Sequence, residues 1–186
     1  MGDSSDRKGR LGRGALGLLF VCDSEADTRA IACGLKGSDG VPEWARVDNA
    51  DDLRGVLARK AWDAVLYCPP ARRLSATAAL ALVKKCDADL PFILVTEAAD
   101  EELALQAVQS GASDCLAKGQ PARLSFTIER EVRGAEARRA LRGAAAERDL
   151  LAQQRQLALD AAHMGWWHYD PATRISTWDD RYKEIF

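Results

Sequence analysis

The stretch Asp63-Ala-Val-Leu-Tyr-Cys-Pro-Pro70 decides the fold of this chain. Its central residues, from Ala64 to Cys68, form an apolar run of strand length that two prolines stop. A continuous apolar strand is typical of a parallel sheet that helices cover on both faces. Such sheets gather their functional residues at the carboxyl ends of the strands. The stretch therefore predicts a thiol, that of Cys68, at the position where chemistry is expected.

Strand-length apolar runs and helical patterns alternate on both sides of this stretch. Further strands are predicted at 16–21, 43–47, 90–96 and 113–118. Apolar residues recur at helical spacing over 25–35, 49–57, 75–85 and 100–109. This rhythm predicts an α/β fold, a doubly wound five-stranded parallel sheet with right-handed crossovers and helices on both faces.

The composition limits what the chain can do. Its 186 residues hold one ordinary domain plus extra segments, and a net charge of -2 shows no basic footprint for nucleic acid. Five cysteines without a repeated C-x-x-C spacing argue against a disulfide framework or a zinc knuckle, and favour a reducing, cytoplasmic setting. The sequence shows no apolar stretch of the roughly 20 residues that a membrane span needs.

The amino-terminal segment, residues 1–14, has almost no apolar content, which predicts a disordered tail. Its basic residues precede the apolar run 15–22 in the manner of a short signal peptide with a lipid-attachment cysteine. That run is at the short limit for an export signal, and bulky Val21 precedes Cys22. We therefore interpret the run as the first strand of a domain that extends over 15–122.

One long helix is predicted over 123–162, because the chain after Pro121 carries no further proline in this region. An apolar face that can pack on the sheet is formed by Leu124, Ile128, Val132 and Ala135. Further along, apolar residues recur every seven positions at Leu150, Leu157 and Met164, with Gln154 and Ala161 between them. Two interpretations stay open: the helix pairs in a parallel dimer, or it is a lone solvated linker.

The last segment, 163–186, reads as two short strands joined by an Asp-Pro turn and followed by the start of a helix. It carries three of the five tryptophans, Trp166, Trp167 and Trp178, yet it is too small to bury a core. We expect it to be disordered or to contact a neighbouring chain, and we expect further chain after Phe186.

Four stretches of the domain resemble the receiver domain of two-component response regulators, in order and with matching spacing over about 15–130. They are Leu18-Leu-Phe-Val-Cys-Asp-Ser-Glu-Ala-Asp27, Trp62-Asp-Ala-Val-Leu-Tyr-Cys68, Pro91-Phe-Ile-Leu-Val-Thr96 and Gly111-Ala-Ser-Asp-Cys-Leu-Ala-Lys118. The resemblance implies the flavodoxin-like strand order 2-1-3-4-5.

In such receivers, an acidic pair and an aspartate hold magnesium, and that aspartate accepts a phosphoryl group from a histidine kinase. A hydroxyl and a lysine contact the phosphoryl oxygens. By this resemblance, three residues keep the pattern: Asp23 as the second acid, Thr96 as the hydroxyl and Lys118 as the lysine. Three depart from it: Cys22 at the first acid, Cys68 at the phospho-acceptor and Cys115 at the aromatic switch position.

Thiols change the expected chemistry, because magnesium prefers oxygen ligands and Cys68 has no carboxylate that could form an acyl phosphate. We expect a degenerate pocket without catalytic residue, metal or cofactor, in which Lys118 pairs with Asp23. The protein would then act by protein interaction. The alternative is a thiol-based redox or metal sensor through Cys22, Cys68 and Cys115, against the plain interpretation of the cysteines as small buried hydrophobic residues.

The end of the chain is similar to the opening of a PAS sensory domain, over Leu159-Asp-Ala-Ala-His-Met-Gly-Trp-Trp-His-Tyr-Asp-Pro-Ala-Thr-Arg-Ile-Ser-Thr-Trp178 and then Tyr182-Lys-Glu-Ile-Phe186. This resemblance implies a longer signalling protein with an output such as a histidine kinase or a cyclic-dinucleotide enzyme. We expect a homodimer through the long helix, through the face of the fourth helix, fifth strand and fifth helix, or through both. The other partners expected are signalling proteins, rather than nucleic acid or a membrane.

Overall fold

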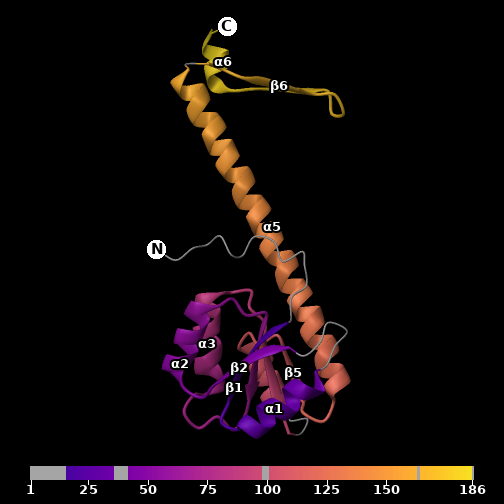
Figure 1. Cartoon of the computed structure of the whole chain (residues 1–186). Helices are drawn as coiled ribbons and strands as arrows, with labels where there is room; N and C mark the ends of the chain where they lie inside the picture. Colours follow the sequence, from indigo (N-terminus) through magenta and orange to yellow (C-terminus); the bar gives the residue numbers. More distant parts are fainter. Residues whose placement is uncertain (1–15, 36–41, 98–100, 163, 186) are drawn as a thin grey trace. The chain divides into compact units, whose positions relative to one another are not determined.

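The computed structural model describes residues 16–35, 42–97, 101–162 and 164–185. A parallel sheet of five strands has the order β2-β1-β3-β4-β5, which confirms the predicted fold class (Figure 1). The strands are β1 (Gly17–Cys22), β2 (Glu43–Val47), β3 (Ala64–Cys68), β4 (Phe92–Thr96) and β5 (Asp114–Ala117). The tail predicted over 1–14 lies outside the described residues.

Four helices connect these strands, and polar side chains fix where three of them begin. They are α1 (Glu25–Gly34), α2 (Ala50–Arg59), α3 (Ala76–Cys86) and α4 (Glu101–Gln109). The Ser24 hydroxyl accepts a hydrogen bond from the Asp27 amide at 3.1 Å, and Asn49 and Ser75 accept from the first turns of α2 and α3. Each cap satisfies a backbone donor that the helix itself leaves unpaired.

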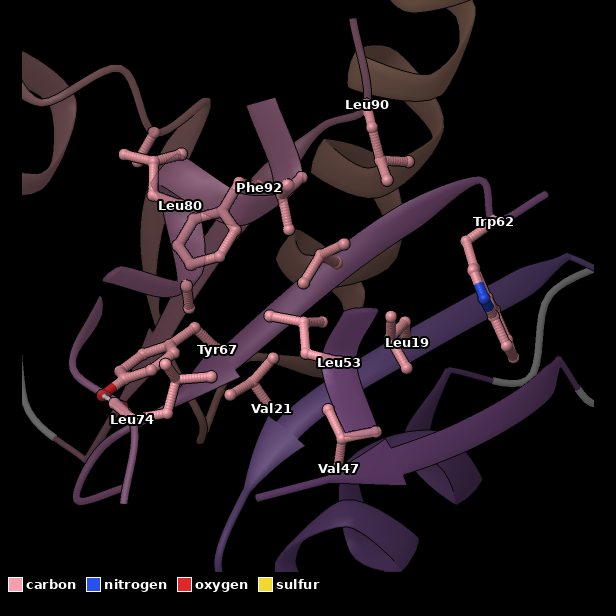
Figure 2. Packing of buried hydrophobic residues seen from close by; sticks show 14 of the residues in the cluster. Leu19, Val21, Val47, Leu53, Trp62, Tyr67, Leu74, Leu80, Leu90 and Phe92 are labelled. Carbon is pink, nitrogen blue, oxygen red and sulfur yellow. Dashed lines mark hydrogen bonds between the residues drawn. The ribbon is translucent and has the colours of Figure 1, made fainter. Parts of the chain in front are cut away.

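Buried side chains alternate between the two faces of the sheet, as the pleat of a strand requires. On one face, α2 and α3 cover β1, β3 and β4, with Leu53, Val65, Leu80 and Phe92 among the buried residues. Figure 2 shows this cluster, in which the Tyr67 hydroxyl donates a hydrogen bond to the Leu74 carbonyl at 2.9 Å.

The opposite face of the sheet packs against α1 and the start of α5. Its cluster is made of Leu18, Phe20, Cys22, Ile31, Ala32, Leu35, Ala64, Leu66, Cys68, Ile93, Val95, Leu116, Leu124 and Ile128. The last residues of β1 and β3 therefore direct their side chains to the α1 and α5 side. This assignment decides which functional side chains can meet.

The helix α5 (Pro121–Ala161) has 41 residues, and only its first part is buried. Leu124, Thr127, Ile128 and Ala135 are buried. The chain forms two compact units, Met1–Arg138 and Arg139–Phe186, so that the boundary falls inside this helix. No helix among the described residues is both long and apolar enough to cross a membrane.

The second unit contains the end of α5, a hairpin and a short helix: β6 (Trp167–Asp170), β7 (Ile175–Trp178) and α6 (Asp180–Ile185). The strands are antiparallel, and the rings of Trp167 and Trp178 stack across them at 6.0 Å between centroids. The Asp179 carboxylate begins α6, because it accepts hydrogen bonds from the amides of Trp166 at 3.0 Å and Tyr182 at 2.8 Å.

Candidate functional site

The candidate site lies at the carboxyl edge of the sheet, where Cys22 ends β1 and Cys68 ends β3. The two residues are direct partners in the parallel register, and both side chains belong to the cluster under α1 and α5. They are buried, with 2% and 1% of their surface exposed. The strands β1 and β3 thus place two thiols side by side where a sheet of this type carries its chemistry.

The contact between the two thiols shifts their pKa values in opposite directions. The hydrogen bond from Cys68 lowers the pKa of Cys22 to about 6, although burial and the charge of Asp27 act against this. The Cys22 thiol donates a hydrogen bond to the Ser24 carbonyl at 3.3 Å, and the Thr28 hydroxyl donates to the same carbonyl at 3.0 Å. The same contact with Cys22, together with burial, raises the pKa of Cys68. The contact thus lowers the pKa of Cys22 and raises that of Cys68, which makes Cys22 the more acidic thiol of the pair.

The carboxylate of Asp23, the next residue along the chain, is engaged by the loop after β3. Its Oδ2 accepts a hydrogen bond from the Arg72 amide at 3.0 Å. The side chain of Arg46 at β2 donates to the Cys22 carbonyl at 2.8 Å, which holds the end of β1 from the other side. The Asp23 carboxylate thus links the segment after β1 to the loop after β3 at this edge.

Lys118 follows β5 and does not pair with Asp23, so that this expectation was wrong. Its Nζ lies 2.8 Å from Asp27 Oδ2 and 2.6 Å from Glu97 Oε1. The reason is the position of Asp27 in the first turn of α1, where it faces the end of β5, whereas the Asp23 carboxylate is bound to the loop amide. Burial alone would lower the pKa of Lys118, but the hydrogen bonds to Asp27 and Glu97 outweigh it and raise the pKa.

Cys115 lies on the other face of the sheet from Cys22 and Cys68. It packs against the cluster under α2 and α3, while the other two cysteines belong to the cluster under α1 and α5. A sensor site shared by all three cysteines is therefore wrong, because the pleat of β5 directs Cys115 away. Among the described residues, no group of three or more His, Cys, Asp or Glu side chains is arranged to hold a metal ion.

Thr96 ends β4 at the same edge, as expected, and is buried. Its carbonyl accepts a hydrogen bond from the Lys118 amide at 2.8 Å, which ties the ends of β4 and β5 together. Cys22, Asp23, Cys68, Thr96 and Lys118 thus all lie at one edge of the sheet.

Sequence reasoning missed Asp27 and Glu97 as the partners of Lys118. Asp27 lies in the first turn of a helix that Ser24 caps, and a carboxylate is favoured there for helix stability alone. Glu97 follows directly on Thr96 in an exposed position. The available signal was charge: Glu97 directly follows β4, and Asp27 lies in the first turn of the helix that follows β1.

The edge does not suit magnesium. Magnesium takes hard oxygen ligands in a near-octahedral array. Here two of the three positions that would supply carboxylates are thiols, and the carboxylate of Asp23 already accepts a backbone amide. A pair of soft sulfur ligands instead suits redox chemistry or soft metal ions.

No family model matches the sequence, and no curated protein matches it. Solved structures do resemble it. NtrX from Brucella abortus is 25% identical with a TM-score of 0.60, over 69% of this chain and 30% of that chain. The receiver domain of a sensor histidine kinase from Pseudomonas aeruginosa, solved with a magnesium ion in its active-site cleft, is 20% identical with a TM-score of 0.53, over 64% of this chain and 98% of that chain.

A further similar structure is the signal receiver domain of a Luxo repressor protein from Vibrio parahaemolyticus. It is 19% identical with a TM-score of 0.59, over 69% of this chain and 98% of that chain. Receiver domains are therefore matched over almost their full length, whereas this chain spans about a third of the NtrX chain. The first unit of this chain has the receiver fold.

Proposed function

We propose that this chain is the sensory part of a signalling protein, in which a pseudo-receiver acts by protein interaction and cannot accept a phosphoryl group on an aspartate. The observation that carries the proposal is the position of Cys68, at the end of β3 in a receiver fold, with Cys22 as its register partner. An acyl phosphate needs a carboxylate at this position, and a thiol offers none.

The contacts around Cys68 support the same proposal. In a working receiver, the retained lysine would be available to a phosphoryl oxygen. Here Lys118 is held by Asp27 and Glu97, with only 15% of its side chain exposed. The Asp23 carboxylate is bound to the Arg72 amide. The polar groups that remain thus stabilise one arrangement of the edge, as a scaffold requires.

The long helix and the hairpin support an architecture that passes a state from one module to the next. Leu150, Leu151 and Leu157 are exposed on α5, with 53%, 58% and 68% of their surface accessible. Burial of such leucines in a parallel homodimer would supply the stability that a single solvated helix lacks. The hairpin and α6 fit the start of a PAS domain, and we propose that the full protein continues into an output domain.

A titration with beryllofluoride and magnesium tests the loss of phosphotransfer. We expect neither the tryptophan fluorescence nor the mass from light scattering to change, because the edge lacks the carboxylates that bind both. The matched control is the double variant C22D/C68D, which restores the acidic positions and should gain a saturable response. A saturable response of the unchanged chain would overturn the proposal.

A further inference from the structure

We propose that Cys22 and Cys68 form a dithiol redox site, in which a hydroperoxide oxidises Cys22 and Cys68 then closes a disulfide between the ends of β1 and β3. This goes beyond the scaffold role, because it gives the edge a chemical input of its own. It also differs from a three-cysteine sensor, since Cys115 takes no part.

The register of the sheet carries the proposal. Neighbouring strands lie about 4.8 Å apart, which falls inside the range of about 4.4–6.8 Å between Cα atoms of disulfide-bonded cysteines. Cys22 and Cys68 face each other directly in that register and on the same side of the sheet. Both are free thiols in this structure. The bond can therefore form without moving the strands far.

The surroundings assign different roles to the two thiols. The contact with Cys68 lowers the pKa of Cys22 to about 6, and the Cys22 thiol donates a hydrogen bond to the Ser24 carbonyl at 3.3 Å. The thiolate is the nucleophilic form of cysteine. The pKa of Cys68 is raised by the same contact and by burial, and Cys68 is the direct register partner of Cys22. Cys22 is thus the attacking thiol and Cys68 the resolving thiol.

The reaction balances in two steps. The Cys22 thiolate attacks the peroxide: a sulfur–oxygen bond forms, the oxygen–oxygen bond breaks, and the leaving alkoxide or hydroxide takes a proton to become alcohol or water. The sulfur of Cys68 then attacks the sulfenic acid on Cys22: the sulfur–sulfur bond forms, the sulfur–oxygen bond breaks, and the hydroxide leaves as water with the proton of Cys68. Two thiols are oxidised and one peroxide is reduced.

Burial sets the rate of the reaction. With 2% and 1% of their surfaces exposed, Cys22 and Cys68 react only when the loops at the edge open locally. Cys33 on α1 and Cys86 on α3 are exposed and should react first. The oxidation product, rather than the speed, is therefore the property that distinguishes the site.

The experiment uses the full chain with C33S, C86S and C115S, so that only the two buried thiols remain. After treatment with hydrogen peroxide and digestion without reductant, mass spectrometry should find the peptides of Cys22 and Cys68 joined, two hydrogen atoms lighter than their sum. Dithiothreitol should restore both thiols. In the same background, C68S should stop at a sulfenic acid that dimedone traps on Cys22, and C22S should give neither product.

Two results would overturn the proposal. The first is that exhaustive treatment with peroxide yields no disulfide between Cys22 and Cys68. The second is that oxidation joins two chains rather than two strands. Either result leaves the scaffold role untouched, because that role is tested by the absence of a beryllofluoride response. Circular dichroism of each variant checks that it is folded.

Discussion

Lys118 illustrates how a residue can keep its place in a fold while its chemistry changes. Its ammonium group lies at the edge that carries the reaction in a working receiver, yet two carboxylates from different elements hold it there. The contacts join the first turn of α1 to the segments that follow β4 and β5. We interpret Lys118 as a structural cation that connects three neighbouring elements.

Replacing Lys118 tests this interpretation. The variant K118M should lower the free energy of unfolding by about 1 kcal/mol, because the ion pairs are only partly shielded from solvent. The matched control is R29M, which removes an ion pair with Glu25 on the exposed surface of α1 and should have a smaller effect. Urea unfolding measures both. Equal effects of the two substitutions would contradict a connecting role for Lys118.

The thiol pair predicts a characteristic dependence of stability on pH. The pKa of Cys22 is lowered from 9.0 to about 6, so between these values the unfolded chain binds more protons and stability rises with pH. The pKa of Cys68 is raised, so above about 9 the folded chain retains a proton that the unfolded chain loses, and stability falls. The contribution of the pair should therefore be greatest near pH 9.

Urea unfolding of the reduced chain over this pH range measures the effect. The variant C22S removes the thiolate and should abolish the rise between about pH 6 and pH 9. The ultraviolet absorbance of thiolates in the folded chain should likewise show one titration near pH 6 that C22S lacks. A rise of unchanged size in C22S would show that other groups cause it.

At the scale of the element, α5 changes its role along its length. Its first part is held against the sheet by apolar contacts, and one polar contact follows near the end of the first unit. There the Arg138 side chain donates to Asp89 at 3.3 Å, and the Asp89 side chain is 7% exposed. This ion pair fastens the helix to the loop before β4.

The substitution R138M should destabilise the first unit by about 1–3 kcal/mol, because it removes a partner from a buried carboxylate. The substitution R133M, on the same helix, removes an exposed ion pair with Glu129 and should cost less than about 0.5 kcal/mol. Chemical unfolding followed by tryptophan fluorescence, to which the buried Trp62 of the first unit contributes, compares the two. Equal costs would show that Asp89 does not depend on Arg138.

The elements of the fold could be predicted from the sequence, whereas part of the site could not. Continuous apolar runs of strand length predict the parallel sheet, because strands of such a sheet are buried on both faces. The pairing of Cys22 with Cys68 followed from the strand order. The partner of Lys118 depended on the first turn of α1 and on a loop amide, and the side of Cys115 depended on the pleat of β5. Such contacts between elements produce no periodic pattern in the sequence, so they could not be predicted from it.

For the whole molecule, the homodimer that we propose could form through either of two exposed apolar surfaces. The second unit exposes Leu150 and Leu157 on the helix, and the first exposes Leu105, Val108 and Phe126 on α4 and α5. The spacing of seven residues between Leu150 and Leu157 favours the helix as the principal contact.

Two sets of substitutions separate these surfaces. If the proposed homodimer forms through the long helix, the variant L150E/L157E should be a monomer in light scattering, because it places charge in the proposed contact between helices. The variant L105E/F126E should leave the mass unchanged. If only the second pair dissociates the dimer, the long helix is a solvated linker and the receiver face is the contact.

The stacked indoles of Trp167 and Trp178 have an optical consequence. Two identical transition dipoles with ring centroids 6.0 Å apart and planes inclined at 27° couple their excited states. Such a pair splits its ultraviolet band into two lobes of opposite sign in circular dichroism, a signal that a single tryptophan cannot produce. The hairpin should therefore give its own circular-dichroism signal. A W178F substitution should remove this signal, while the bands of the helices remain.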